Sequence, residues 1–367
     1  MDDLAYMRLA LELAKQGEGW TSPNPMVGAV IVKNGQIIGK GWHERYGSLH
    51  AERSAIHACT QSPDGATMYV TLEPCCHQGH QPPCTDAILE AGITRVVIGS
   101  QDPNPLVAGK GLELLRQHGL QVETGILKQE CDSLNRVFFH YIQTGRPYVV
   151  LKYAMTMDGK IATRTGASQW ITSPEARERV HQDRHRYTAI MTGVGTVLSD
   201  DPLLTCRIPG GKNPIRIICD THLRTPLDSQ IVRTAQKVPT ILVTCGAGER
   251  CAPYQQAGCQ VWDLPAKDGH VDLHLLMDRL GKAQIDSILL EGGGALNWSA
   301  LESGIVQKVQ TYLAPKLFGG TQAPSPIGGL GVSLPSQAVG LTHTTITQLG
   351  PDFLLESEVE PYVYRNC

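Results

Sequence analysis

The first 145 residues alternate between helical and extended patterns of apolar positions. Residues 2–16 repeat apolar side chains at helical spacing, whereas 27–32 and 37–42 are apolar segments joined by Lys33-Asn34-Gly35-Gln36, which predicts a β-hairpin. Further strands are predicted at 67–72 and 96–99, and helices just after His50 and at 84–91, 109–118 and 128–143. This order of elements predicts one sheet with helices on both faces.

A second series of elements begins after Thr144-Gly145-Arg146-Pro147, whose turn-forming residues end the preceding helix. Strands are expected at 148–154, 189–192, 215–219, 240–244, 287–290 and 308–314, and helices at 174–185, 271–280 and 295–303. We therefore expect two α/β domains, residues 1–145 and 146–367. Residues 324–335 are rich in glycine, proline and serine, which predicts an exposed loop.

The composition is typical of a soluble globular protein. Of the 367 residues, 41% are apolar and 18% are charged, and the formal net charge is −3. Such a charge offers no broad attraction for nucleic acid, and no apolar run reaches the roughly 18 residues that span a bilayer. The chain start lacks the pattern of a signal peptide, so the eleven cysteines are expected to be reduced thiols in a cytoplasmic protein. We expect neither nucleic acid nor membrane partners; a homo-oligomer is compatible with this composition.

His50-Ala51-Glu52, Pro74-Cys75 and Cys84 together offer an imidazole, two thiols and a carboxylate. Imidazole and thiolate ligands suit zinc, and three protein ligands leave the fourth tetrahedral position open for water, as in catalytic zinc sites. Zinc lowers the pKa of that water towards neutrality, and Glu52 can carry protons from the water to a leaving amine. The pattern is similar to the signature of zinc nucleobase deaminases.

The spacing of these residues constrains their local structure. Residues two apart in the middle of a helix do not share a face, so we expect His50 and Glu52 in the first turn of a helix. Cys84 is expected at a helix N-terminus, where the helix dipole favours a thiolate.

A structural zinc knuckle is the alternative for this part of the chain. Cys75, Cys76, His77, His80 and Cys84 supply enough ligands for a closed four-ligand site. That site leaves the His50 and Glu52 pair without a role, so the catalytic interpretation is favoured. An exchange of Cys76 for its neighbour Cys75 at the metal stays open.

The second domain contains a strand, glycine turn and helix at 287–303, with Glu291-Gly292-Gly293-Gly294 as the turn. Glycines allow close approach of the backbone, and free amides at a helix start attract phosphate. A tight turn that binds nothing is about as common. A second such turn, at 193–196, modestly favours a phosphate-rich ligand, and basic residues lie near both turns: Lys152, Arg184, Arg207 and Arg224.

Over nearly its full length the chain resembles the bifunctional deaminase/reductase family of riboflavin biosynthesis. The resemblance rests in the first half on residues 23–28, 50–52, 71–75, 82–84 and 101–105, and in the second half on 157–160, 168–172, 193–202, Asp220 with Arg224, and 314–316. Eight residues separate Cys75 from Cys84, whereas many cytidine and tRNA deaminases have two there. This longer loop is similar to the riboflavin branch.

The resemblance implies a fold and two consecutive reactions. A cytidine-deaminase-like α/β/α domain would remove the 2-amino group of a diaminopyrimidinone that carries a ribosylamino 5′-phosphate. A dihydrofolate-reductase-like α/β domain would then use NADPH to reduce the ribosyl group of the resulting uracil to ribityl. The implied cofactors are one Zn²⁺ and NADPH, and the implied partner is the small pyrimidine ribotide.

The resemblance also implies residue roles. His50, Cys75 and Cys84 would hold zinc, Glu52 would transfer the proton, and Asn24 and residues 102–104 would frame the pyrimidine. The implied NADPH contacts are Ala154, Trp170, Thr196, Asp200, Thr221, Gly293, Gly294, Ala295, Leu296, Asn297, Trp298 and Ser299. The implied substrate contacts are Ser168, Arg184, Leu204, Arg207 and Glu291, among which the guanidinium groups match phosphate with paired hydrogen bonds.

The chain departs from the family pattern in three places, and every implied ligand is still present. Cys76 stands where serine is common, and Arg53 stands where a smaller or apolar residue is frequent. Residues 205–213 form a shorter segment than the family pattern has.

Two other functions stay open. One is deamination of another base, cytidine or tRNA adenosine, with an accessory nucleotide-binding domain. The other is a zinc-stabilised nucleotide-binding module without catalysis.

Overall fold

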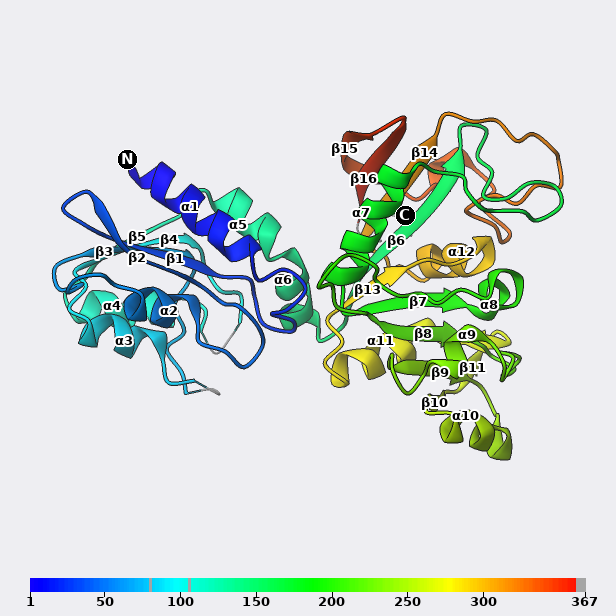
Figure 1. Ribbon diagram of the computed structural model, residues 1–367, viewed down its shortest axis with the longest axis horizontal. Helices are drawn as coiled ribbons and strands as arrows, with labels where there is room; N and C mark the ends of the chain where they lie inside the picture. The colour runs from blue at the N-terminus through cyan, green and yellow to red at the C-terminus, as the bar shows by residue number, and fades with distance from the viewer. Residues whose placement is uncertain (79–80, 105–106, 361–367) are drawn as a thin grey trace. The chain divides into compact units, whose positions relative to one another are not determined.

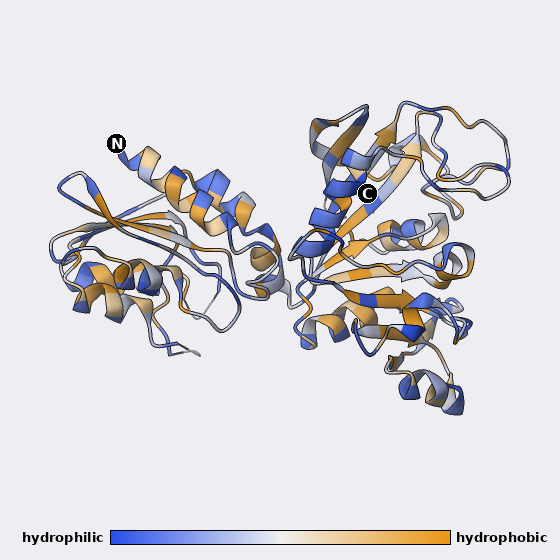
Figure 2. Cartoon of the chain, viewed as in Figure 1, coloured by the Kyte–Doolittle hydropathy of each residue, from blue (hydrophilic) through white to orange (hydrophobic). Residues whose placement is uncertain are grey.

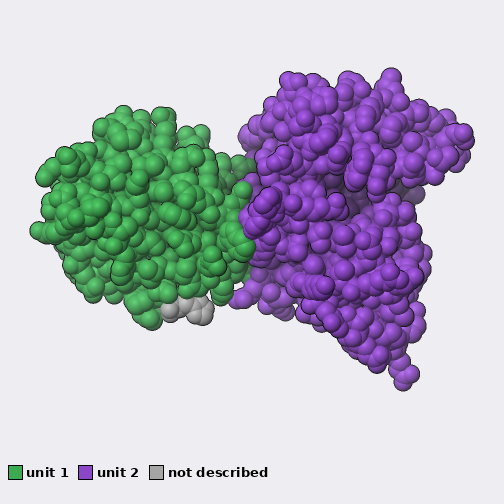
Figure 3. Space-filling view, viewed as in Figure 1, with its two compact units in different colours: residues 1–145 green, residues 146–367 purple. Residues whose placement is uncertain are grey.

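The computed structural model describes residues 1–78, 81–104 and 107–360. The chain divides into two compact units, Met1–Gly145 and Arg146–Cys367, which Figure 3 shows in different colours. None of the helices within the described ranges combines the length and the hydropathy that a membrane crossing requires. In Figure 2 the central strands of both units are mainly apolar, which places the core of each unit at its sheet.

The first unit is built on a five-stranded sheet in the order β2-β1-β3-β4-β5 (Figure 1). β1 pairs antiparallel with β2 and β3, whereas β3, β4 and β5 are parallel. The strands are β1 (Gly28–Lys33), β2 (Gln36–Trp42), β3 (Thr67–Leu72), β4 (Arg95–Ser100) and β5 (Gln121–Thr124). The helices are α1 (Asp3–Lys15), α2 (Ala51–His57), α3 (Cys84–Glu90), α4 (Lys110–Gln117), α5 (Lys128–Leu134) and α6 (Arg136–Thr144).

Alternate residues of the central strands face two separate helical layers. Ala29 and Ile31 of β1 pack with side chains of α2, α3 and α4, while Val30 and Val32 pack with side chains of α1 and α5. This alternation follows from the two-residue period of a strand. The prediction of one sheet with helices on both faces is confirmed.

Two local predictions in this unit have different outcomes. The predicted hairpin forms, and Asn34 and Gly35 take the positive φ angles of 50° and 75° that a tight two-residue turn requires. The single helix predicted at 128–143 is wrong, because it is divided at Asn135 into α5 and α6. The buried Asn135 side chain binds both the backbone N–H and the carbonyl of Met26, at 2.8 and 2.9 Å, a long-range contact that helical periodicity does not reveal.

The second unit contains a nine-stranded sheet in the order β10-β9-β8-β7-β13-β6-β14-β16-β15. Its first seven strands are parallel, and β16 and β15 add an antiparallel edge. The strands are β6 (Tyr148–Thr156), β7 (Ala189–Gly193), β8 (Ile215–Cys219), β9 (Thr240–Thr244), β10 (Gln260–Asp263), β13 (Ser287–Leu290), β14 (Lys308–Ala314), β15 (Leu341–Leu349) and β16 (Asp352–Val359), and a separate ribbon pairs β11 (Ala266–Lys267) with β12 (His270–Val271).

Helices cover both faces of this sheet as well. α11 and α12 share one apolar core with β6, β7 and β13, while α8, α9 and α10 pack on the opposite face, where α7 lies against β14 and β16. The helices are α7 (Pro174–Arg186), α8 (Val194–Asp200), α9 (Gln230–Arg233), α10 (Ala252–Gln256), α11 (Leu273–Lys282) and α12 (Gly294–Glu302), with short 3₁₀ turns at Gly248–Cys251 and Pro335–Gln337.

Several elements of this unit were not predicted from the sequence. The turn expected at 193–196 is instead the start of α8, for which Gly193 is the N-cap. The hairpin of β15 and β16 also escaped prediction, because β15 is largely exposed on both faces and carries no apolar alternation. Residues 324–334, by contrast, form a mostly exposed loop as expected.

Candidate active sites in the two units

Three side chains of the first unit bring their metal-binding atoms together. His50 Nδ1 lies 3.5 Å from Cys75 Sγ and 3.3 Å from Cys84 Sγ. The ligand atoms all lie within 4.8 Å of one another, and among the described residues this is the group of histidine, cysteine and acidic side chains that could hold a metal ion. One nitrogen and two sulfur donors fit zinc, and three protein ligands are the number found in catalytic zinc sites.

The backbone explains why residues distant in sequence converge here. His50 is the N-cap of α2, with extended φ and ψ angles of −69° and 157°, so its side chain leaves the helix at its first turn. Cys84 is the first residue of α3. Its N–H and that of Thr85 donate to the carbonyl of Cys75, at 3.0 and 3.2 Å, and so close the loop between the two cysteines. Both helix-start predictions are confirmed.

The two thiols of this group ionise unequally. A hydrogen bond from the Cys84 thiol lowers the pKa of Cys75 to about 4. Burial of Cys75 opposes this effect, and His50 adds to it. The same hydrogen bond, together with burial, raises the pKa of Cys84 well above its usual value. Zinc takes both sulfurs as thiolates, so metal binding would release the proton that Cys84 keeps.

Glu52 is the second residue of α2 and is 4% exposed. Burial and the negative charge of Cys75 raise the pKa of the Glu52 carboxyl to about 7. A proton-transfer group beside three metal-ligand side chains is the arrangement that hydrolytic loss of an amine requires.

The closed knuckle considered above is not favoured by this geometry. Cys76 is not a member of the described ligand group, and His80 lies outside the described residues. Since His50 takes part and Glu52 lies two residues after it in the chain, the catalytic interpretation gives each of these side chains a role.

Two further polar groups lie around the first site. The Asn24 carboxamide nitrogen is 3.2 Å from Nε2 of His43, whose ring meets that of His50 edge-on at 5.6 Å. His43 is buried and was not singled out from the sequence, since a lone histidine after a strand carries no distinguishing pattern. Asp102 is also buried; burial, with the charges of Glu73 and Cys75, raises its pKa to about 6.

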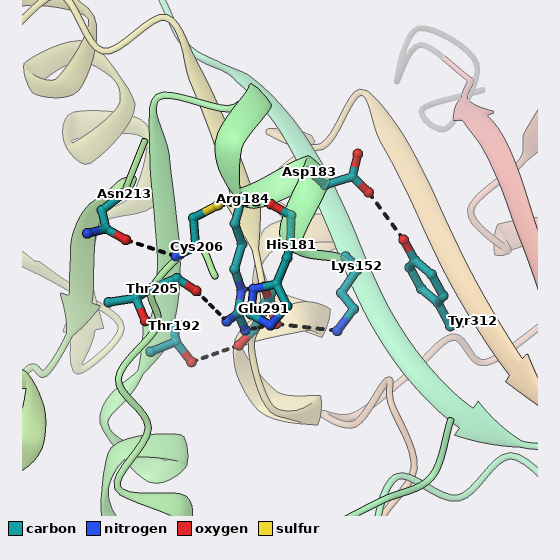
Figure 4. Close-up of polar contacts among 10 residues, drawn as sticks. All are labelled: Lys152, His181, Asp183, Arg184, Thr192, Thr205, Cys206, Asn213, Glu291 and Tyr312. Atoms are coloured by element: carbon teal, nitrogen blue, oxygen red, sulfur yellow. Dashed lines mark hydrogen bonds and ion pairs between the residues drawn. The ribbon is translucent and has the colours of Figure 1, made fainter. Parts of the chain in front are cut away.

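The second site centres on Glu291, the residue after β13 (Figure 4). Its carboxylate accepts two hydrogen bonds from Arg184 of α7, at 2.8 and 3.0 Å, and lies 3.3 Å from the Lys152 ammonium of β6. Burial raises the pKa of Glu291, but the two cations outweigh that effect and lower it to about 2. A largely buried carboxylate with two cations next to it can orient a polar, phosphorylated ligand.

The loop after α8 is tied to this centre. Arg184 donates through Nη1 to the carbonyl of Thr205 at 3.0 Å, and the Cys206 N–H donates to the Asn213 side chain at 3.0 Å (Figure 4). Leu204 in this loop is buried with a φ angle of 50°. The structure therefore brings Arg184, Glu291 and the Leu204 segment together, whereas Arg207 is exposed and Ser168 belongs to a separate loop before α7.

Most residues expected to contact NADPH lie at one edge of the second sheet. β8, β7, β13 and β6 are neighbouring parallel strands, so their carboxyl ends meet at that edge. Ala154 lies near the end of β6, Thr196 and Asp200 lie on α8 after β7, Thr221 follows β8, and residues 293–299 start α12 after β13. The starts of α8 and α12, each with a glycine as N-cap, lie at this edge, and free backbone amides at helix starts fit a dinucleotide phosphate.

Trp170 and Asn297 differ from the other expected NADPH contacts in their surroundings. Trp170 is 59% exposed, its ring lies 4.6 Å below the Arg177 guanidinium, and Lys316 donates to its carbonyl at 3.1 Å. Asn297 is fully buried and donates to the carbonyl of Pro326 at 2.8 Å, which ties α12 to the 324–334 loop.

Two family models match the chain in succession. The cytidine and deoxycytidylate deaminase zinc-binding region matches residues 1–100, and the RibD C-terminal domain matches residues 147–355. The first match supports zinc as the metal of the first site. The second supports NADPH as the cofactor of the second. A deaminase of another base with an accessory domain is not favoured, because the second domain matches a riboflavin-pathway reductase.

Relatives and solved structures agree over nearly the whole chain. The riboflavin biosynthesis protein RibD of Actinobacillus pleuropneumoniae is 56% identical, covering 97% of this chain and 95% of that protein, and that of Escherichia coli is 41% identical, covering 97% and 99%. Acinetobacter baumannii RibD, form 1, has a TM-score of 0.88 at 35% identity, covering 97% and 98%. A Thermotoga maritima diaminohydroxyphosphoribosylaminopyrimidine deaminase/5-amino-6-(5-phosphoribosylamino)uracil reductase has a TM-score of 0.85 at 37% identity with the same coverage. The chain therefore belongs to the RibD family of bifunctional deaminase/reductases of riboflavin biosynthesis.

Proposed function

We propose that residues 1–145 form the zinc-dependent pyrimidine deaminase domain and residues 146–367 the NADPH-dependent reductase domain. The observation that carries the proposal is the convergence of His50, Cys75 and Cys84 beside the buried Glu52. Each domain then holds one candidate site with its own chemistry.

The first domain would hydrolyse the 2-amino group of a diaminopyrimidinone that carries a ribosylamino 5′-phosphate. Water adds at the carbon that bears the amine, ammonia leaves, and a uracil ring results. His50, Cys75 and Cys84 would hold zinc, which when bound supplies the Lewis acidity that lowers the pKa of water. Glu52 would accept a proton from the water and deliver it to the leaving nitrogen. Asn24 and residues 102–104 would frame the ring.

The second domain would reduce the ribosyl group of the deaminated product to a ribityl chain. NADPH, when bound at the edge formed by β8, β7, β13 and β6, supplies the hydride. The proposed cofactor contacts are Ala154, Trp170, Thr196, Asp200, Thr221 and residues 293–299. Ser168, Arg184, Leu204, Arg207 and Glu291 would bind the substrate, in which the guanidinium groups suit the phosphate.

The proposed partner is therefore a small phosphorylated pyrimidine, with neither nucleic acid nor membrane required for either step. We place the enzyme in the cytoplasm, because Cys75 and Cys84 must stay reduced to act as thiolate ligands. An assembly of several copies is compatible with this function, and the mass in solution would decide it.

The test is a paired assay on the full-length, zinc-loaded protein. Given the diaminopyrimidinone ribotide and NADPH, the enzyme should release one ammonia and then oxidise one NADPH per substrate. Ammonia release from cytidine or tRNA in place of the ribotide would contradict the substrate assignment. Zinc binding without any turnover would contradict the catalytic role of the first site.

A further inference from the structure

Glu73 is a buried carboxylate of the first unit that the proposed chemistry does not use. It directly follows β3 and lies two residues before Cys75, and it is 3% exposed. Its backbone N–H donates to the carbonyl of Ser100 at the end of β4, at 2.9 Å.

Within the described part of the chain, the Glu73 side chain accepts four backbone hydrogen bonds from residues that lie far away in the sequence. One carboxylate oxygen accepts from the N–H groups of Gly111 and Leu112, at 3.1 and 3.4 Å. The other accepts from Gly109 and Asp102, at 3.0 and 3.4 Å. Gly109 is the N-cap of α4 and offers no side-chain cap of its own. Glu73 therefore caps α4 from the neighbouring strand, where the helix dipole favours an anion.

Close packing also holds the start of α4 against the segment that carries Glu73 and Pro74. A Cβ atom placed on Gly111 would lie 2.4 Å from the carbonyl oxygen of Pro74 and 3.3 Å from a carboxylate oxygen of Glu73. The first turn of α4 therefore rests directly on the residue that precedes Cys75. A side chain at position 111 would separate the two segments.

The segment on the far side of Glu73 leads to the candidate pyrimidine-binding residues. The amide of Asp102 binds Glu73, and the Asp102 carboxylate in turn accepts the N–H of Asn104 at 2.8 Å. One carboxylate thus contacts both the segment that carries Cys75 and the segment that carries Asp102 and Asn104.

We propose that Glu73 is a positioning residue of the deaminase, which sets the distance between the metal-binding loop and the pyrimidine-binding segment. The inference rests on the proposed function of the His50, Cys75 and Cys84 site. In the described residues the Glu73 carboxylate binds backbone N–H groups; it acts through the backbone of Asp102 and through its covalent neighbour Pro74. Displacement of the substrate relative to the attacking water should weaken productive binding, while His50, Cys75 and Cys84 still retain zinc.

The test uses Glu73→Gln in the full-length, zinc-loaded protein. The amide keeps the size of the side chain but loses the charge and turns an NH₂ group towards one pair of backbone N–H donors. We expect unchanged zinc content and a rise of about tenfold in the deaminase KM, less than the roughly hundredfold that a misplacement of about 1 Å can cost. The fall in kcat should be smaller, and NADPH oxidation with the deaminated substrate should be unchanged.

Asp2→Asn is the matched control, because Asp2 also caps a helix of this unit, accepting the Ala5 N–H at 2.9 Å, but has no link to the site. Asparagine keeps the N-cap hydrogen bond, so this variant should leave the deaminase KM as in the wild type. If Glu73→Gln does not fold, Gly111→Ala tests the same junction and should raise KM with zinc retained.

Three results would overturn the inference: a folded Glu73→Gln variant with the wild-type KM, loss of zinc from that variant, or an equal rise of KM in Asp2→Asn. Failure of the proposed function would be visible separately, because the wild-type, zinc-loaded protein would then release no ammonia from the diaminopyrimidinone ribotide.

Discussion

Arg184 and Glu291 form a two-point ion pair across the reductase site, with Arg184 Nε 2.8 Å from Oε1 and Nη2 3.0 Å from Oε2 of the carboxylate. Their side chains are 13% and 12% exposed. The pair joins α7 to the end of β13 and leaves the third guanidinium nitrogen to hold Thr205. A lysine at position 184 could not make this paired contact.

Removal of the Glu291 charge should destabilise the second unit and stop the reductase. Glu291→Gln leaves Arg184 and Lys152 buried without their counter-ion, which typically costs about 3–5 kcal/mol. Ammonia release should continue, because the metal-ligand group lies in the other unit. Urea unfolding and NADPH oxidation measure the two effects. Glu302→Gln, at an exposed position of α12, is the control and should behave as the wild type.

The ion pair of Arg184 and Glu291 predicts that the folded protein loses stability in acid. Burial raises the pKa of Glu291, but Arg184 and Lys152 lower it from 4.5 to about 2. The folded protein therefore binds fewer protons than the unfolded chain between these values. The stabilisation is complete above about pH 4.5 and is lost as the pH falls towards 2. The difference in thermal midpoint between wild type and Glu291→Gln should shrink from about pH 6 to about pH 3; a constant difference would contradict the ion pair.

Glu52→Gln should retain zinc and lose ammonia release. The amide preserves the shape of the buried side chain, but it cannot carry a proton, and general acid–base groups contribute roughly 10²–10⁴-fold to rate. Zinc analysis and ammonia release on the same preparation test this, with the exposed Glu44→Gln as the control. Loss of zinc from Glu52→Gln would show that Glu52 supports the metal and would refute its assigned role.

Removal of the metal should separate the two activities. A chelator should abolish ammonia release, while the reductase continues to oxidise NADPH with the deaminated substrate. Cys84→Ser should reproduce this split, because it removes one of two thiolate ligands. Re-addition of zinc should restore the chelated wild type but not Cys84→Ser. Parallel loss of both activities on chelation would place a required metal in the second unit as well.

Arg207→Ala should weaken binding of the reductase substrate. Arg207 is exposed on the loop that Arg184 anchors, so its loss should leave the fold intact and remove a charged hydrogen bond to the ligand. Such bonds contribute about 1.5–3 kcal/mol, so KM should rise roughly tenfold or more, with NADPH affinity and ammonia release unchanged. A KM equal to that of the wild type would exclude Arg207 from the site.

Local patterns in the sequence were sufficient for the order of most strands and helices and for the metal-ligand set. Strands such as Thr67–Leu72 and Ser287–Leu290 are short segments rich in apolar, aromatic and β-branched residues, and proline or glycine follows within two residues, so their position is a short-range property. His50, Cys75 and Cys84 could be chosen because few residue types bind zinc, and their spacing fits two helix starts.

Contacts between residues far apart in the sequence determined where one helix is divided, how another is capped and which charges are paired, and local patterns could not predict these features. Asn135 divides a helix because its side chain binds Met26, and Glu73 caps a helix that begins well beyond it in the chain. The counter-ion of Arg184 is Glu291, which directly follows a strand more than a hundred residues further along the chain. These partners carry no common period or spacing in the sequence. Only the pairing order of the strands brings them within hydrogen-bond distance.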